Sequence, residues 1–443
     1  MTLATSSLRR TAPAPPVRIV HLGLGAFSRS HTAWYTGAAS NASQWGISAY
    51  TGRSSALAEA LTEQDGLFTL VERDADGDRA AVVESIVSAR SGEDGESIVA
   101  EIAAPSTAIV TLTITEVAYL LDERDRPDTA DPVVVADDMI LRAAIRGEAI
   151  ASIVPSSVLG RLLWALELRR RRRAGGLAVV PCDNIPDNGG RLRRGILSWA
   201  RELSPALASW IEQDVSFVST SVDRITPRVG PEEVSALFGE YGDRAPVVTE
   251  PFRDWVLSGD FPAGRPAWES AGALFVSDIE PWEARKLWLL NGAHTLLSAL
   301  GRLREHRTVA EAIADSECRH AVTVFWDEAQ RHLPEELAVD DYRAALLRRF
   351  ENPRIVHELA QIATDIPTKI RLRIVPVAER ELAAGRLAAG CAVGIGVWLA
   401  AADAGLVAGP AADTPTGSAV ASLSALLGAD ERFIATVDAR RRS

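Results

Sequence analysis

Residues 17–31 read VRIVHLGLGAFSRSH. The apolar run Val17–Leu22 predicts a buried β-strand, and Gly23 and Gly25 predict a tight turn that leads into a helix over Ser30–Ala39. A strand, a glycine turn and a helix in this order are typical of the first unit of a dinucleotide-binding fold, because the turn lets phosphate groups approach the backbone. The stretch therefore predicts the start of a Rossmann-type domain.

Strand and helix signals alternate through the first part of the chain. Helical patterns lie between several short apolar runs that predict further strands, namely Gly46–Tyr50, Phe68–Glu72, Ala108–Ile114, Leu177–Pro181 and Val215–Thr220. Such alternation is typical of α/β proteins with a doubly wound, mostly parallel sheet. We expect this fold class for the N-terminal part.

Beyond about Asp278 the strand signals nearly vanish and helical periodicity dominates. The proline-rich residues 1–16 predict a disordered tail, and a Rossmann-type dinucleotide-binding domain is expected over residues 17–275. A mainly α-helical substrate and catalytic domain is expected over residues 276–443. Its last stretch, Thr414–Ser443, is rich in alanine and arginine and predicts a frayed helix.

The composition is that of an ordinary globular protein. The chain has 443 residues, of which 47% are hydrophobic and 24% charged, so two domains with sizeable cores are expected. A net charge of -12 disfavours a nucleic-acid partner, because phosphate contacts need a basic surface. The apolar runs are shorter than the roughly 20 residues that cross a bilayer, and the start lacks a signal-peptide core. We expect a cytoplasmic protein without a membrane partner.

The cysteines and histidines do not predict a metal site or a disulfide framework. Cys182, Cys318 and Cys391 are far apart, and the seven histidines show no paired-ligand spacing. The basic run Arg169–Arg173 precedes Gly175, which favours cations in a last helical turn before a glycine cap over an anion-binding patch. The chemistry is therefore expected from side chains and an organic cofactor.

The glycine turn is the predicted cofactor site. Gly23 and Gly25 would let the pyrophosphate come close, and Ala26 and Phe27 of the same turn are further predicted cofactor-binding residues. Ser28 replaces the third glycine of the usual fingerprint, so a merely structural turn is the alternative.

The residues after the second strand bear on the choice between NAD and NADP. An acid that accepts hydrogen bonds from the ribose is usual there, but this chain has Thr51-Gly52-Arg53. Arg53 could hold the extra phosphate of NADP, or it could be a surface arginine near a helix cap. Both NAD and NADP are compatible with these residues.

The segment Glu280–His294 carries the predicted catalytic base. On an α-helix Lys286 and His294 lie about 80° apart, with Asn291 three residues before His294 in an otherwise apolar stretch. Burial would lower the pKa of such a lysine, which suits a base that removes a hydroxyl proton. A lysine with an exposed amine and a histidine satisfied in the core are the alternative.

Two further polar clusters follow predicted strands. Asn184, in CDNIPDNG, could donate to a developing alkoxide, although an Asx turn explains the same residues. Asp223, in SVDRITPR, could accept a substrate hydroxyl or orient the lysine, with a surface salt bridge as the alternative. Both lie where ligands bind in open α/β sheets.

Together these segments resemble the polyol-specific long-chain dehydrogenase family, which includes mannitol dehydrogenases and fructuronate (mannonate) reductases. The resemblance spans nearly the whole chain. It rests on five motifs: GLGAFSRSH at Gly23–His31, TLTITE at Thr111–Glu116, CDNIPDNG at Cys182–Gly189, VDRITPR at Val222–Arg228 and KLWLLNGAH at Lys286–His294. The last of these is the most specific.

The resemblance implies roles for individual residues. Lys286 is similar to the general base of the family, and Asn184 and Asn291 are similar to the pair that stabilises the developing oxyanion. His294 resembles a substrate contact, and Asp223 matches another active-site position. The implied reaction moves a hydride between a polyol or sugar acid and the nicotinamide of NAD or NADP, without a catalytic metal.

Substrate-binding residues are implied farther along the chain. Lys369 resembles a residue that reaches into the substrate pocket, and Arg373 is a second candidate. Arg371 departs from the proline expected there, which leaves the sugar open, and Ser28 stands where a histidine is common. Mannitol, arabinitol, a phosphorylated polyol and mannonate, or the corresponding ketoses, are all compatible substrates, and a monomer is compatible with the sequence.

Two other functions remain open from the sequence. A β-hydroxyacid dehydrogenase of the phosphogluconate type also joins a Rossmann domain to a helical domain and uses a lysine; it would release carbon dioxide. A non-catalytic dinucleotide-sensing protein would bind the cofactor without turnover, and Lys286→Ala would leave its function intact. Three polar clusters predicted near one cleft disfavour the sensor.

Overall fold

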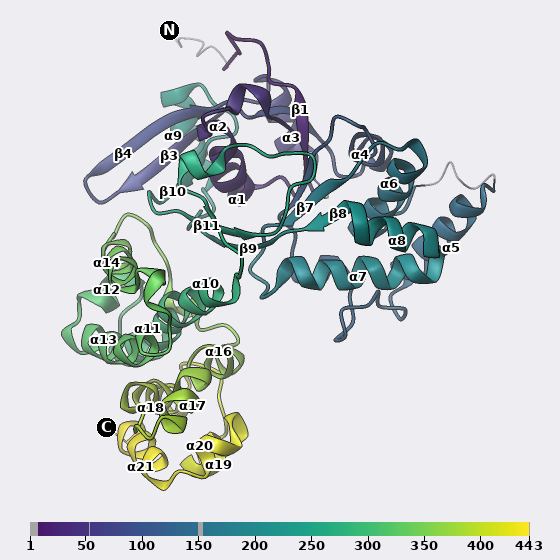
Figure 1. Cartoon of the computed structure of the whole chain (residues 1–443). Helices are drawn as coiled ribbons and strands as arrows, with labels where there is room; N and C mark the ends of the chain where they lie inside the picture. Colours follow the sequence, from purple (N-terminus) through teal and green to yellow (C-terminus); the bar gives the residue numbers. More distant parts are fainter. Residues whose placement is uncertain (1–7, 53, 149–153, 443) are drawn as a thin grey trace. The chain divides into compact units, whose positions relative to one another are not determined.

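The computed structural model describes residues 8–52, 54–148 and 154–442 (Figure 1). The chain divides into two compact units. The first holds the described residues up to Arg73 together with Gly77–Ile279, and the second holds Asp74–Asp76 and Glu280–Ser443. The sequence placed the boundary between its two domains at residue 275.

The N-terminal segment, expected to be disordered over residues 1–16, lies partly outside the described residues, which begin at Leu8. Within the described part, Arg10 makes several hydrogen bonds. Its backbone N–H donates to the Asp65 carboxylate at 3.1 Å. Its guanidinium donates to the Glu84 and Ile86 carbonyls, both at 2.5 Å. These bonds attach the segment to the first unit.

The first unit is built on a six-stranded sheet with the order β5-β2-β1-β6-β7-β8, in which every neighbouring pair is parallel. Each strand is an apolar run of a few residues. The strands are β1 (Val17–Leu22), β2 (Gly46–Tyr50), β5 (Ile86–Arg90), β6 (Ile109–Leu112), β7 (Leu177–Pro181) and β8 (Val215–Phe217). The order runs outward in both directions from β1 and β6, which confirms the predicted doubly wound Rossmann-type sheet.

Helices cover both faces of this sheet, because successive strand residues point to opposite faces. In β1, Val20 belongs to one apolar cluster and Ile19 to the other, and both side chains are fully buried. The Val20 cluster includes five helices: α4 (Gly95–Ile102), α5 (Pro132–Arg146), α6 (Val158–Arg172), α7 (Asn188–Leu203) and α8 (Pro205–Asp214). The Ile19 cluster includes the helical stretch α1 (Ala26–Ser28), η1 (Arg29–Ala33) and α2 (Trp34–Ala38), followed by α3 (Ala56–Thr62). Strands that are buried on both faces read as continuous apolar runs, as observed.

Two small sheets and a further helix complete the first unit. One sheet has the order β10-β3-β4 and the other β12-β11-β9. Their strands are β3 (Phe68–Asp74), β4 (Gly77–Val83), β9 (Ser219–Asp223), β10 (Val247–Thr249), β11 (Asp254–Ser258) and β12 (Leu274–Phe275), and α9 spans Pro231–Tyr241. The strand predicted at Phe68–Glu72 therefore forms, but outside the central sheet.

The predicted strand Val215–Thr220 is wrong as a single element. The Val218 N–H still donates to the Val179 carbonyl of β7 at 2.9 Å. From Ser219 the chain pairs antiparallel with β11 instead. The residues change sheets because β11 offers a new partner, which the local sequence does not reveal.

The basic run at the end of α6 has a structural explanation. The helix ends at Arg172, and Arg173, with φ 55°, takes the left-handed cap position that was expected of Gly175. Arg169 is only 1% exposed, and its guanidinium donates to the carbonyls of Ile102 at 2.9 Å and Ala104 at 2.6 Å. The run thus ties α6 to the loop after α4.

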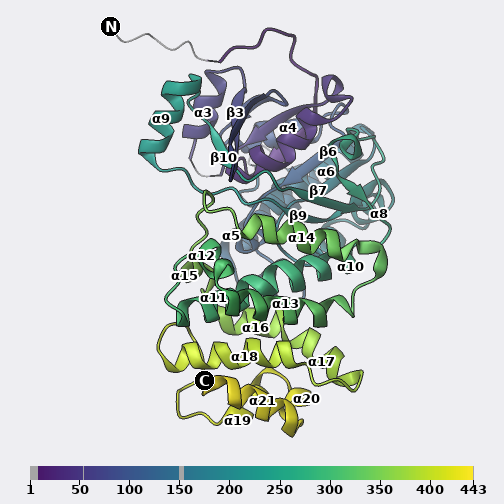
Figure 2. The ribbon, with the colours of Figure 1, turned by 90° about the vertical axis from the view of Figure 1, so that its left-hand side faces the viewer.

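Apart from the tip Asp74–Asp76, the described part of the second unit is mainly helical, as the helical periodicity predicted (Figure 2). Its α-helices are α10 (Glu280–Arg285), α11 (Ala293–Leu303), α12 (Val309–Ala314), α13 (Ser316–Gln330), α14 (Val339–Phe350), α15 (Leu359–Ile362), α16 (Ile366–Arg373), α17 (Val375–Ala383), α18 (Ala389–Asp403), α19 (Thr416–Leu423), α20 (Ala425–Gly428) and α21 (Glu431–Arg441). Among the helices that the structure describes, none is both long and apolar enough to cross a membrane.

Helix α18 is the centre of this unit and packs against α11, α13, α17 and α21 (Figure 2). Gly390 allows close contact, since a Cβ there would lie 2.8 Å from the backbone nitrogen of Phe325. The stretch Thr414–Ser443 was expected to end in a frayed helix; its helix α21 continues to Arg441, and Phe433 and Val437 are fully buried. The apolar faces of the last helices close the core against α18.

Candidate functional site

The turn after β1 requires glycine at its first position. The Gly23 and Leu24 N–H groups both donate to the Tyr50 carbonyl, at 2.9 and 2.8 Å. Gly23 has φ +100°, and a Cβ there would lie 2.3 Å from the Thr113 carbonyl oxygen. A side chain at this position would therefore clash with the loop after β6, so Gly23 is needed to fold the turn.

Gly25 differs, because the protein itself leaves room around it. A Cβ at this position would meet nothing nearer than the Gly23 carbonyl oxygen at 3.7 Å. The helical stretch then starts at Ala26, so the N–H groups of Ala26 and Phe27 have no partner within the helix. Ser28, in place of the third glycine, accepts a hydrogen bond from the Gly25 N–H at 2.9 Å and closes the first turn.

This turn forms one side of a cavity of about 540 Å³ at the carboxyl ends of β1, β6 and β7. The cavity is lined by Gly23, Gly25, Ala26, Phe27, Ser28, Thr113, Ile114, Thr115, Glu116, Cys182, Asp183, Asn184, Ile185 and Val222. It lies where the strand order reverses between β1 and β6, the usual ligand position in such sheets. Four of the predicted cofactor residues and Asn184 thus line the same cavity, whereas Arg53 lies outside the described residues.

The loop that carries Asn184 is held by neighbours that the sequence analysis did not single out. The Asn188 side chain donates to the Pro181 carbonyl at 3.3 Å and to the Thr220 carbonyl at 3.1 Å. The Tyr119 hydroxyl donates to the Asp183 carboxylate, and burial raises the pKa of Asp183. Single polar residues such as Tyr119 carry no sequence signal for this role.

Asp223 ends β9, where it is paired opposite Asp254 of β11. It is 8% exposed, which disfavours the alternative of a salt bridge at the surface. The next residue, Arg224, is also buried, and it donates to the Ser30 carbonyl at 2.6 Å and to the Glu72 carboxylate. Arg224 thereby fixes the end of β9 against the π-helical segment η1.

In the second unit, the segment predicted to carry the catalytic base forms a π-helical segment, η6 (Lys286–Gly292), between α10 and α11. The predicted angle of 80° between Lys286 and His294 required a regular α-helix, so it does not hold here. A Cβ at Gly292 would lie 2.6 Å from the Phe325 ring, and the Trp326 indole donates to the Leu289 carbonyl at 2.7 Å. These contacts with α13 fit the wide turn, and such turns are frequent at functional sites.

His294 is 7% exposed and packs against His357 of the loop before α15, with ring centroids 4.9 Å apart. Burial lowers the pKa of His294 well below 6.5, and nearby His357, Arg349, Arg373 and Lys369 add to the effect. Burial also lowers the pKa of His357 to about 4. Both rings are therefore neutral at pH 7, so each can donate and accept a hydrogen bond.

Two of the other predicted residues of this unit, Lys369 and Arg373, act electrostatically on His294. Arg373, at the end of α16, donates to the Asn291 carbonyl at 3.2 Å and to the Thr295 hydroxyl at 3.0 Å. Lys369, one turn earlier, donates to the Ile362 carbonyl at 3.0 Å. Lys286 and Asn291 are half-buried within η6. Sequence reasoning missed several neighbours of His294, among them His357, Arg349 and Phe350, whose ring centroid lies 4.8 Å from that of His294.

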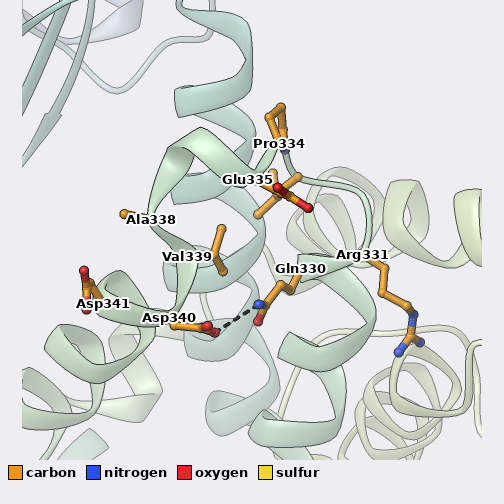
Figure 3. Close-up of a pocket in the computed structure, with 9 residues that line it drawn as sticks. Gln330, Arg331, Pro334, Glu335, Ala338, Val339, Asp340 and Asp341 are labelled. Atoms are coloured by element: carbon orange, nitrogen blue, oxygen red, sulfur yellow. Dashed lines mark hydrogen bonds between the residues drawn. The ribbon is translucent and has the colours of Figure 1, made fainter.

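A second cavity, of about 630 Å³, lies in the second unit at the junction of α13 and α14 (Figure 3). The Gln330 side chain points toward Asp340 and donates to its carboxylate at 3.0 Å. Arg331 donates to the Glu381 carboxylate at 2.6 Å. Because these groups satisfy one another and the residues predicted for chemistry do not line it, this cavity is not a candidate site.

One group of potential metal ligands occurs in the described part of the chain: His306, Asp315 and Cys318. The Arg304 guanidinium already donates to the Asp315 carboxylate at 2.8 Å, and this contact lowers the pKa of Asp315. The other carboxylate oxygen accepts from the N–H groups of Glu317 and Cys318 at the start of α13. The Asp315 carboxylate therefore has a structural role: it pairs with Arg304 and caps α13.

Comparisons with known proteins agree with the two units. Residues 17–270 match the family described as mannitol dehydrogenase Rossmann domain, and residues 278–404 match mannitol dehydrogenase C-terminal domain. The chain is 35% identical over 394 residues to D-mannonate oxidoreductase of Escherichia coli strain K12, covering 86% of this chain and 79% of that protein.

Solved structures show the same likeness. A Pseudomonas fluorescens mannitol 2-dehydrogenase, in ternary complex with NAD and D-mannitol, has a TM-score of 0.75 and 30% identity. The match covers 97% of this chain and 92% of that one. A D-sorbitol dehydrogenase in substrate-free form has a TM-score of 0.81 and 30% identity, over 90% of this chain and 83% of that one.

Proposed function

The chain belongs to the mannitol dehydrogenase family of oxidoreductases, and we propose that it transfers a hydride between NAD and a secondary alcohol of a polyol or sugar acid. The observation that carries the proposal is the cavity at the strand switch point, where Gly25 leaves space beside the start of a helix. The relatives named for mannitol and mannonate support this class of substrate.

The residues of the first unit suit a dinucleotide. The N–H groups of Ala26 and Phe27 would bind the pyrophosphate, and the missing side chain of Gly25 lets it approach. When bound, the nicotinamide supplies the carbon that accepts or returns the hydride. NAD is the cofactor of the mannitol 2-dehydrogenase complex, and we propose it for this chain.

Lys286 is the proposed general base. Its amine would take the proton of the substrate hydroxyl as the hydride leaves the same carbon, and would return that proton when a ketose is reduced. The side-chain amides of Asn184 and Asn291 would stabilise the negative charge that develops on the oxygen. His294 would bind a neighbouring hydroxyl, and Asp223 would accept another or orient the lysine.

The test is to follow NADH and NADPH absorbance while the purified protein meets fructose, fructuronate, tagaturonate or fructose 6-phosphate. We expect NADH oxidation with at least one of them, and a fall in kcat of about 10²–10⁴-fold for Lys286→Ala, the usual contribution of a general base. Arg371→Ala, which replaces an exposed cation of α16, is the matched control.

Two results would contradict the proposal. Carbon dioxide released together with the reduced cofactor during oxidation of a sugar acid would indicate the decarboxylating β-hydroxyacid type. Cofactor binding without turnover of any of these compounds, unchanged in Lys286→Ala, would indicate a sensor.

A further inference from the structure

We propose that the sugar substrate carries an anionic group and that Lys369 and Arg373 of α16 bind it. The inference rests on the proposed function and deepens it, because it distinguishes a charged sugar from a neutral polyol. The two residues are four apart on one helix, so their side chains lie on the same face. Like charges at this spacing destabilise a helix, so the juxtaposition of the two charges does not itself stabilise α16.

Neither cation is neutralised within the described part of the chain. Among the described residues, no carboxylate oxygen lies within 4.0 Å of the Lys369 amine or the Arg373 guanidinium, and both groups donate to carbonyls or to a hydroxyl. Asp365 is the acid that acts on Lys369 at longer range, and its carboxylate accepts a hydrogen bond from Thr368 at 2.9 Å. By contrast, Arg304, Arg319, Arg331 and Arg386 of the same unit all form ion pairs.

The two charges are also partly removed from water. Both side chains are half-buried, and burial lowers the pKa of Arg373 to about 10 and that of Lys369 below its usual value. At pH 7 both groups still carry a proton. Half-buried cations without a counter-ion are unfavourable, and an anionic ligand group would remove that cost.

The neighbouring histidines offer hydrogen-bonding atoms for the rest of a sugar. Within the described residues, the buried Nε2 of His294 and Nδ1 of His357 have no hydrogen-bond partner. Arg373 donates to the hydroxyl of Thr295, the residue that follows His294, and the charges of Lys369 and Arg373 lower the pKa of His294. A ligand with hydroxyls for the imidazoles and an anion for the cations would satisfy all four groups.

A structural role for Arg373 is the competing explanation, because it holds the Asn291 carbonyl and the Thr295 hydroxyl. Both bonds use one guanidinium nitrogen, Nη1, which leaves the other two nitrogens of the fork for a ligand. Lys369 spends one of its three N–H donors on Ile362. Replacement of Lys369 therefore tests the charge without disturbing Asn291.

The experiment compares kcat/KM for fructose, fructuronate and fructose 6-phosphate in the wild type and in Lys369→Gln, Arg373→Gln and Arg371→Gln. We expect the wild type to prefer an anionic ketose over fructose by at least about tenfold, and each of the first two variants to lose about 10–100-fold on that substrate, mainly in KM. In Lys369→Gln, the loss on the anionic ketose should be at least about tenfold larger than the loss on fructose. Arg371, exposed on the same helix, should be neutral. The two charged ketoses identify the anion as carboxylate or phosphate.

A wild type that uses fructose as efficiently as both charged ketoses would overturn the inference and leave the proposed function intact. Equal losses on fructose and on the charged ketose would assign Lys369 and Arg373 to the fold instead. Calorimetric titration of mannonate, mannitol 1-phosphate and mannitol gives a reading that does not depend on turnover. If neither anion binds more tightly than mannitol, the inference fails, whatever the activity assays show.

Discussion

The imidazole rings of His294 and His357 meet edge to face, with their centroids 4.9 Å apart. His294 belongs to α11 and His357 to the loop before α15, so the contact joins two elements that are distant in sequence. Both rings are neutral at pH 7 because burial opposes their charged forms. Protonation of either histidine would therefore oppose the packing of these two elements.

The first prediction concerns acid stability. Below pH 6.5 the unfolded chain protonates these histidines, whereas the folded chain takes up the proton of His357 only near pH 4. The unfolded state thus binds more protons over this window, so the free energy of unfolding falls as the pH drops from 6.5 to 4. Calorimetric Tm measured against pH should fall less steeply in His357→Asn. The same slope in wild type and variant would contradict this, and His320→Asn, an exposed replacement, is the control.

The second prediction separates the two glycines of the first turn. Gly23→Ala should lower the free energy of unfolding by about 2–4 kcal/mol, because its Cβ meets the Thr113 carbonyl and φ is positive. Gly25→Ala should keep the stability within about 1 kcal/mol but weaken NADH binding about tenfold, since the new methyl group faces the cavity. Denaturant unfolding and NADH fluorescence measure the two effects. Equal cofactor affinity in Gly25→Ala and wild type would exclude this turn as the phosphate site.

The third prediction concerns the basic run. Arg169→Gln should destabilise the protein by about 3–5 kcal/mol, because several buried carbonyls, including those of Ile102 and Ala104, lose their donor. Arg172→Gln, three residues later and exposed, should change stability by less than about 0.5 kcal/mol. Urea unfolding of the two variants is the measurement. Similar small effects in both would mean that water replaces the Arg169 guanidinium.

The fourth prediction concerns the start of α18. The buried Glu328 carboxylate accepts from the N–H groups of Gly390 at 2.7 Å and Cys391 at 2.8 Å. Glu328→Ala should cost about 2–4 kcal/mol, because two buried N–H groups are left without acceptors. Glu335→Ala, at an exposed position, should be close to neutral. Thermal unfolding would contradict the prediction if the two variants melted together.

Much of the fold could be predicted from short apolar runs. β1, β2 and β7 have the predicted bounds. A strand that is buried on both faces is apolar at nearly every position, so the apolar run shows where it begins and ends. What a run does not state is which sheet its strand joins, which is why β3 and β9 were placed wrongly. Pairing depends on partners such as β11, which lie far along the chain.

The candidate site was predictable only in part. The glycine turn and Asn184 follow strands of the central sheet, so topology alone brings them to one cavity. The contact of His294 with His357 depends on how α11 and the loop before α15 pack, and neither residue signals it. The α-helical spacing failed at Lys286 because the π-helical turn depends on Phe325 and Trp326 of another helix.

The π-helical segment η6 determines how the protein responds to deletion of a single residue. A wide turn accommodates one residue more than an α-helix over the same rise. Deletion of a single codon within 287–291 would let the segment rewind as an α-helix and would keep α11 in register with Lys286. The same deletion within α11 would turn every later side chain by about 100°. We therefore expect single-codon deletions in residues 287–291 to impair folding less than deletions in residues 293–303, which a library of single-codon deletions across residues 280–303 would reveal.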